Sequence, residues 1–95
     1  MGEVRIGSVS LRHPVMTASG TAGYGIELGR YLDLSSLGAV VVKSLAHFPW
    51  EGNPAPRLAP VPGGMLNAVG LQGPGIAEWI RHGLVDLERV GARVV

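Results

Sequence analysis

With 95 residues, 46% of them hydrophobic and only 16% charged, the chain is short for a domain and unusually apolar, which suggests that part of its surroundings is missing. A net charge of +1 without any basic run excludes a strong electrostatic footprint for nucleic acid or an anionic membrane, and no apolar block approaches the roughly 18 residues of a membrane span. The chain has no cysteine and no secretory start, so we expect it to be cytoplasmic.

The first elements are short and β-like. Residues 4–11 alternate apolar and polar side chains around Gly7, which predicts a hairpin that is half exposed to water. Residues 14–18 then form an apolar run closed by Ser19 and Gly20, as in a buried strand that ends in a turn. We interpret this run as the first inner strand of a sheet.

A helix and a second strand follow. In residues 26–32 the apolar positions recur at helical spacing through Leu28 and Leu32, and residues 35–38 supply the turn that ends the helix. Residues 39–42 are the β-branched block AVVV, which predicts a second inner strand with Lys43 at its carboxyl end.

Five prolines fall between Pro49 and Pro62, so this segment is predicted to be a functional loop with local extended pieces. Residues 65–71 are apolar except for Asn67, and the Gly-Pro-Gly of residues 73–75 precedes a helix that starts at Ile76. Its predicted apolar face consists of Ile76, Ile80, Leu84 and Leu87.

Residues 91–95 are interpreted as a turn into a third strand that is cut off. The order strand, helix, strand, loop, helix, strand is typical of repeating parallel βα units, which need many strands to close. The sequence therefore predicts an α/β fold, a (β/α)8 TIM barrel truncated near its third strand, with residues 1–95 as part of one domain.

Two polar side chains stand out in this apolar frame. Lys43 is the only lysine, and an ammonium at the carboxyl end of an apolar strand is either an active-site cation or a side chain that extends its head to the surface. Position alone gives these two interpretations equal weight. Asn67 could bind the carbonyl and N–H edge of a planar heterocycle, although an asparagine more commonly caps or hydrogen-bonds neighbouring backbone groups.

Other candidate sites are weaker. Residues 20–25 resemble a glycine-rich phosphate loop but match neither nucleotide-binding spacing, so a plain turn is favoured. His13, His47 and His82 lack metal-ligand spacing and are interpreted as surface or packing residues, and no metal site is expected. Trp50 and Trp79 are interpreted as packing aromatics.

Taken together, the segments PVMTASGTAGYG, DLSSLGAVVVKS and EGNPAPRLAPVPGGMLNAVGLQGPG resemble the N-terminal third of class 1 dihydroorotate dehydrogenases. This resemblance implies an oxidoreductase with FMN at the carboxyl mouth of its barrel. It would oxidise dihydroorotate to orotate in the de novo pyrimidine (UMP) pathway. Gly73, where many relatives have asparagine, and Leu45-Ala46, in place of a threonine-rich pair, depart from the family pattern.

The resemblance also implies residue roles. Ala18, Ser19, Gly20, Lys43 and Ser44 would contact the flavin, and the substrate would be bound by Lys43 together with Asn67, Ala68, Val69, Gly70 and Leu71. The family's general base, a cysteine or serine on a distant loop, has no counterpart in these residues. The 95-residue chain is therefore expected to be inactive alone.

Several alternatives stay open at this stage. The chain could be a non-catalytic barrel fragment or remnant, or part of a dihydropyrimidine dehydrogenase-like pyrimidine-binding barrel. Within the resembled family, the class that passes electrons to a partner subunit with FAD and an iron–sulfur cluster, and then to NAD, is favoured over the fumarate-using class. A homodimeric core is expected, and the sequence does not decide the electron acceptor.

Overall fold

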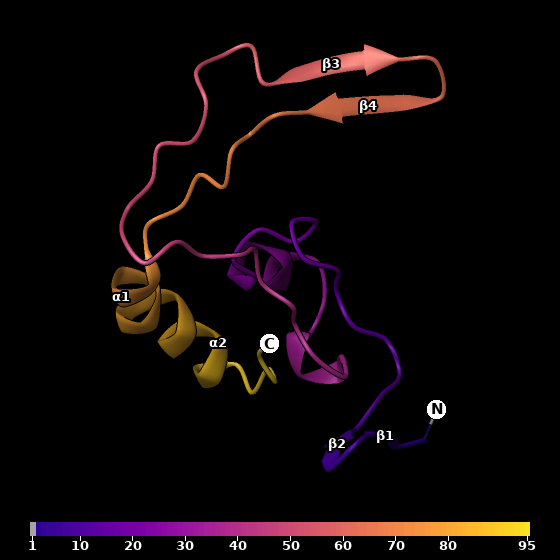
Figure 1. Cartoon of the computed structure of the whole chain (residues 1–95). Coiled ribbons are helices and arrows are strands. Elements are labelled where there is room, and N and C mark those ends of the chain that lie inside the picture. The colour runs from indigo at the N-terminus through magenta and orange to yellow at the C-terminus, as the bar shows by residue number, and fades with distance from the viewer. Residues whose placement is uncertain (1) are drawn as a thin grey trace.

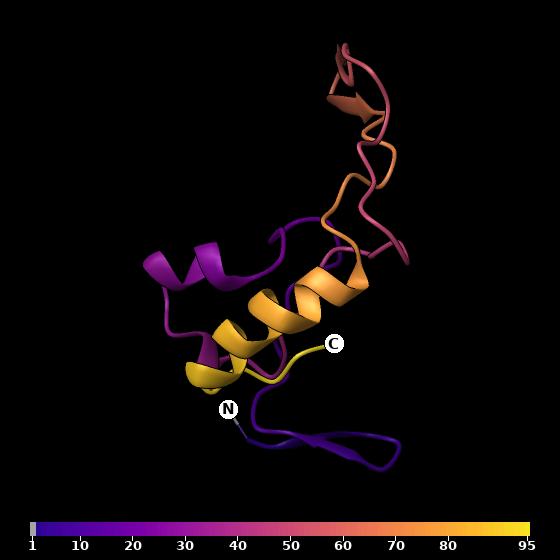
Figure 2. The ribbon, with the colours of Figure 1, turned by 90° about the vertical axis from the view of Figure 1, so that its left-hand side faces the viewer.

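The computed structural model describes residues 2–95 (Figure 1). Short helices pack around a central group of extended segments, and two hairpins project from opposite parts of this body, as the turned view in Figure 2 also shows. In chain order the elements are β1 (Val4–Ile6), β2 (Val9–Leu11), the 3-10 helices η1 (Ile26–Arg30) and η2 (Leu34–Ser36), β3 (Leu58–Val61), β4 (Gly64–Asn67), α1 (Ile76–Trp79), the π-helical η3 (Ile80–Leu84) and α2 (Val85–Arg89).

Residues 39–42 lie at the centre of the body. On one side Gly38 N donates to Val15 O at 2.8 Å and Thr17 N donates to Ala39 O at 3.3 Å, which makes a parallel bridge between Met16 and Ala39. The first two predicted strands are therefore neighbours with parallel direction. Their pairing is an isolated bridge and not a ladder.

The third predicted strand lies on the other side of residues 39–42. Val40 N donates to Arg93 O at 2.7 Å, Val95 N donates to Val40 O at 2.9 Å, and Val42 N donates to Val95 O at 2.9 Å. Val40 and Val94 form a second parallel bridge. Three extended segments thus run side by side in one direction, which is the arrangement that βα repeats produce.

The core lies on one face of these segments and consists of Leu34, Val40, Trp79 and Leu87, all buried. Gly25 is required here, because a Cβ on it would lie 2.8 Å from Val40 Cγ1 and 3.1 Å from a Leu87 methyl group. The prediction that the first strand is buried was wrong. Val15 and Met16 are 49% and 41% exposed, since nothing else in residues 2–95 covers their face.

The predicted helix from Ile76 is confirmed, and three residues of its predicted apolar face, Ile76, Leu84 and Leu87, lie against or in the core. The fourth residue does not. Ile80 is 50% exposed, whereas Trp79 is only 8% exposed and joins the core, as a packing aromatic should. The middle of the helix is π-helical, and a Cβ at Gly83 would lie 2.6 Å from Trp79 Cδ1. The wider turn and the missing side chain make room for the indole, which a constant 3.6-residue period does not anticipate.

The other helix and the loop also differ in detail from their predictions. Residues 26–30 form a 3-10 helix with no side-chain cap, because Gly25 precedes it and Gly29 lies within it. The hairpin at residues 4–11 is confirmed, with Ile6 opposite Val9. The proline-rich loop does contain an extended piece, since β3 pairs antiparallel with β4, and every residue of that hairpin is exposed.

We expect Leu87→Ala to lower the free energy of unfolding by about 3 kcal/mol, because Leu87 is fully buried between the helix and Val40. Ile80→Ala, on the same helix but half exposed, should cost less than about 1 kcal/mol. Urea unfolding followed by circular dichroism measures both changes. Equal losses for the two variants would contradict this assignment of the core.

Candidate functional site at the carboxyl end of the parallel segments

Thr17 fixes how the first two parallel segments end. Its hydroxyl accepts a hydrogen bond from Val41 N at 2.8 Å and donates one to Val41 O at 3.0 Å, so a side chain continues the pairing that the backbone begins. As a result, Ala18 and Ser19 leave their segment beside the point where Lys43 leaves the central one. This is the end at which parallel α/β proteins build their sites.

Lys43 is half-buried at this end. Its backbone N–H donates to Gly23 O at 3.0 Å, which holds the turn of residues 20–25 against the start of the following loop. Gly20 has a φ of +79° and Thr21 closes the turn by donating from both its N and its hydroxyl to Ala18 O, at 3.1 and 2.6 Å. Ala18, Ser19, Gly20 and Ser44 are exposed in this structure.

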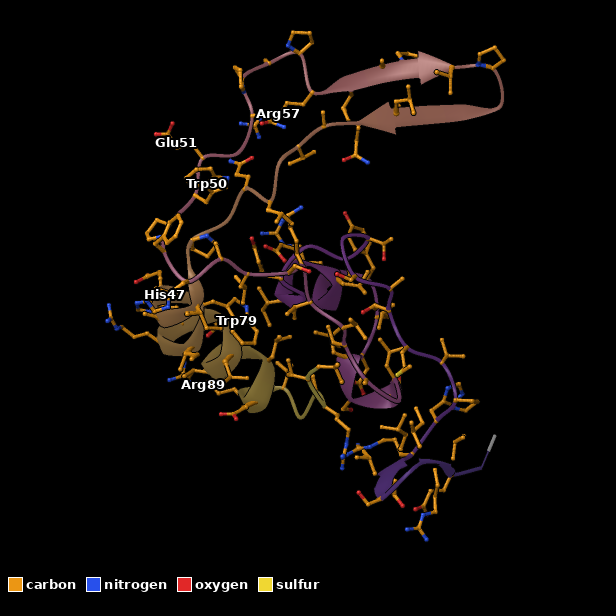
Figure 3. All side chains as sticks on the ribbon, in the orientation of Figure 1. His47, Trp50, Glu51, Arg57, Trp79 and Arg89 are labelled. Carbon is orange, nitrogen blue, oxygen red and sulfur yellow. The ribbon has the colours of Figure 1, made fainter. Side chains whose placement is uncertain are left out.

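An open cleft of about 670 Å³ adjoins Lys43. Its lining comes from three parts of the chain: Tyr24, Lys43, Pro49, Trp50, Glu51, Val69, Gln72, Gly73 and Pro74. Figure 3 shows Trp50 and Glu51 on the segment that leads from the body to the β3–β4 hairpin, with Arg57 farther along it. The cleft thus combines one ammonium, one carboxylate, a phenol, an indole and an amide.

Hydrogen bonds join the two chain segments that form the outer wall of the cleft. Asn53 N donates to Val69 O at 3.0 Å, and its side-chain amide donates to Ala68 O at 2.9 Å. Arg57 donates to Glu51 O at 2.9 Å and to the side-chain oxygen of Gln72. These contacts fix residues 67–72 relative to residues 51–57.

Two glycines permit this close approach. Gly70 has a φ of +80°, and a Cβ on it would lie 2.8 Å from the Asn53 backbone N and from its amide group. At Gly52, with a φ of +76°, a Cβ would lie 2.3 Å from Val69 O. Both glycines are therefore required by conformation and by space.

The residues predicted to bind substrate are divided by the structure. Lys43 and Val69 line the same cleft, whereas Asn67 and Ala68 line a second hollow of about 340 Å³ on the hairpin. Gly70 is half-buried against Asn53, and Leu71 is 57% exposed with a φ of +59°. Asn67 and Lys43 are thus not brought into one cleft here, and their predicted roles stay predictions.

Sequence reasoning missed Tyr24, Glu51 and Gln72. Tyr24 lies in the turn of residues 20–25, yet its hydroxyl reaches across the cleft and donates to Gln72 O at 3.0 Å. Burial raises the pKa of the Tyr24 phenol above its ordinary value. A glycine-rich stretch interrupted by one tyrosine was the available signal.

The aromatic and histidine interpretations have mixed outcomes. Trp50 is not a core residue, as it is 49% exposed and meets Phe48 edge-on with ring centroids 5.5 Å apart. His47 and His82 are exposed, and His13 Nδ1 accepts from Val15 N, in keeping with surface and packing roles. Residues 2–95 contain no cluster of three metal-ligating side chains and no helix long and apolar enough to cross a membrane.

Comparison with known proteins decides the family. The sequence model described as Dihydroorotate dehydrogenase matches residues 1–92. The chain belongs to the dihydroorotate dehydrogenase family. Membership implies a TIM-barrel enzyme, and the three parallel segments agree with the first part of such a barrel.

Similar curated proteins carry the name dihydroorotate dehydrogenase B (NAD(+)), catalytic subunit. The chain is 53% identical over 93 residues to that of Alkaliphilus metalliredigens, 52% identical over 93 residues to that of Thermoanaerobacter pseudethanolicus, and 50% identical over 92 residues to that of Geotalea uraniireducens. These alignments cover 98%, 98% and 97% of this chain but only 31%, 31% and 30% of the relatives. The chain thus spans about a third of their length.

Gly70→Ala should loosen the outer wall of the cleft, because the added methyl group displaces Asn53 and breaks its bonds to residues 68 and 69. We expect trypsin to cut after Arg57 roughly tenfold faster. Gly63→Ala is the matched control, since Gly63 also has a positive φ, +77°, but no neighbour within 4 Å. An equal increase of the cleavage rate in both variants would contradict this prediction, because it would show that the positive φ matters and the contact with Asn53 does not.

Proposed function

We propose that the protein containing these residues oxidises dihydroorotate to orotate with FMN as its cofactor, in pyrimidine biosynthesis in the cytoplasm. The observation that carries the proposal is the position of Lys43. A single ammonium lies half-buried at the carboxyl end of the central parallel segment, in a cleft that it shares with Val69 of the NAVGL run. The names of the relatives support the same activity.

The residues present fit a flavin. Within residues 2–95 no carboxylate lies within 4.0 Å of the Lys43 ammonium, so this charge is free to meet an anionic ligand edge. The neighbouring turn is open, because no other atom lies within 4 Å of the position that a Cβ on Gly20 would take. A planar ring can therefore approach the backbone of Gly20. Ala18, Ser19, Gly20, Lys43 and Ser44 would hold the cofactor.

Bound FMN supplies the acceptor for the hydride that leaves dihydroorotate. Lys43 would stabilise the negative charge that accumulates on the ligand edge, and electrostatic stabilisation of this kind is usually the largest single contribution to catalysis. Asn67 orients the pyrimidine ring through its carbonyl and N–H groups, and the backbone of residues 68–71 holds the substrate carboxylate. The proton lost from the adjacent carbon goes to a base outside residues 1–95.

The same proposal extends to architecture and partners. Residues 1–95 form part of a single FMN-binding domain, whose first three strands are the segments around Met16, Val40 and Val94 in an eight-stranded barrel. The names of the relatives support a catalytic subunit that works with NAD. Electrons would reach NAD through a partner subunit with FAD and an iron–sulfur cluster, and the core would be a homodimer.

The test uses the complete protein encoded by the reading frame that contains residues 1–95. Purified without oxygen, it should carry FMN, and dihydroorotate should bleach the flavin absorbance in a stopped-flow experiment. Lys43→Ala should weaken retention of FMN and slow this reduction by about 100-fold, because the stabilising charge is lost.

Arg5→Ala is the control for loss of one positive charge, since Arg5 lies on the exposed hairpin of β1 and β2. It should leave both FMN retention and the rate of reduction unchanged. A protein that binds FMN but is not reduced by dihydroorotate would refute the proposed activity, and reduction kinetics unaffected by Lys43→Ala would refute the role of Lys43.

A further inference from the structure

Tyr24 connects two parts of the chain that form opposite sides of the cleft. Its hydroxyl donates to Gln72 O at 3.0 Å, across 48 residues of sequence, and its ring packs against the core cluster. The residue before it, Gly23, accepts the backbone hydrogen bond of Lys43 at 3.0 Å. The turn of residues 20–25 therefore contacts both the backbone of Lys43 and the end of the NAVGLQ segment.

Gly73 makes room for this tyrosine. It exchanges two backbone hydrogen bonds with Trp50, each of 2.9 Å, so its position is fixed by antiparallel pairing. Its φ is not positive, unlike those of Gly70 and Gly75, so any residue could adopt its backbone conformation. The available space is what favours glycine here. A Cβ at position 73 would lie only 2.3 Å from Tyr24 Oη, whereas its distance of 3.5 Å from Tyr24 Cζ would be an ordinary contact.

We propose that Tyr24 is a positioning residue that fixes residues 69–73, the end of the segment proposed to bind substrate, against the Lys43 side of the cleft, and that Gly73 leaves the space that its hydroxyl occupies. This inference rests on the proposed function of that segment. It also gives a physical reason for glycine at position 73: the Cβ of any other residue would collide with the Tyr24 hydroxyl.

The pair makes an unusual prediction about two substitutions. Tyr24→Phe removes the hydrogen bond to Gln72 O and also the atom that clashes with a Cβ at position 73. Gly73→Ala removes the same hydrogen bond by pushing the hydroxyl away. Each single variant should therefore have an effect, and the double variant Tyr24→Phe/Gly73→Ala should have no larger effect than Tyr24→Phe alone.

The experiment uses the complete protein and two measurements. Amide hydrogen exchange at Trp50 and Gly73 reports whether the segment is held, and should become about fivefold faster in Tyr24→Phe and in Gly73→Ala. Orotate titration and steady-state kinetics report positioning: the dissociation constant of orotate and the KM for dihydroorotate should each rise about fivefold, while kcat stays within about twofold. Gly64→Ala, whose Cβ meets only Val61 at 3.9 Å, is the control and should change nothing.

The outcomes separate this inference from the proposed function. Unmodified protein that neither binds orotate nor is reduced by dihydroorotate would refute the proposed function and with it a role of Tyr24 in substrate binding. Exchange at Trp50 and Gly73 that is unchanged in Tyr24→Phe, or effects of the two substitutions that simply add, would overturn the Tyr24–Gly73 pair. Faster exchange with unaltered orotate affinity and KM would reduce Tyr24 to a structural residue and overturn its positioning role.

Discussion

The pairing of residues 39–42 with a parallel neighbour on each side is the constraint on which the rest of this structure depends. Backbone hydrogen bonds join this segment to residues 15–17 and to residues 93–95. Val40 is fully buried beside Leu87, in space that is available because Gly25 has no side chain. Because three separate parts of the chain meet here, the segment fixes the helix layer, the turn of residues 20–25 and the exit point of Lys43 together. Parallel pairing of this kind brings distant segments into register without any tight turn.

The two walls of the cleft are held by different kinds of interaction. The inner wall, at Lys43 and Tyr24, adjoins buried apolar side chains, which stabilise it through packing. The outer wall consists of exposed segments joined by the hydrogen bonds of Asn53 and Arg57, and the hydrogen bond of Tyr24 connects it to the inner wall; each bond is worth about 1 kcal/mol net. Its order therefore depends on several weak contacts acting together, and on glycines that let the backbones approach.

Sequence reasoning succeeded where one physical signal dominated. The alternating hairpin and the glycine–proline break before Ile76 each specify a local structure that is present. The β-branched block of residues 39–42 is extended between two parallel neighbours, although its pairing is limited to isolated bridges. It failed where a tertiary contact overrides a local period. Trp79 displaces Ile80 from the core because Gly83 leaves room for an indole, and the 3-10 form of residues 26–30 follows from glycines before and within the helix. The hydrogen bond from Tyr24 to Gln72 could not be found from either segment alone, since it joins residues 48 apart.

The direction of Lys43 follows from the pleat of the strand that carries it. Side chains alternate between the two faces of an extended segment, and Val40 and Val42 both pack on the helix side, against the core. Lys43 therefore belongs to the opposite face, with Ala39 and Val41, and an ammonium there is turned away from the apolar helix layer. Directly after Val42, the last residue paired with the segment of Val95, Lys43 leaves the sheet beside Gly23 and lines the cleft. A compact ammonium on a flexible stem can change its position while the stem stays against the strand, which the rigid fork of an arginine does less readily.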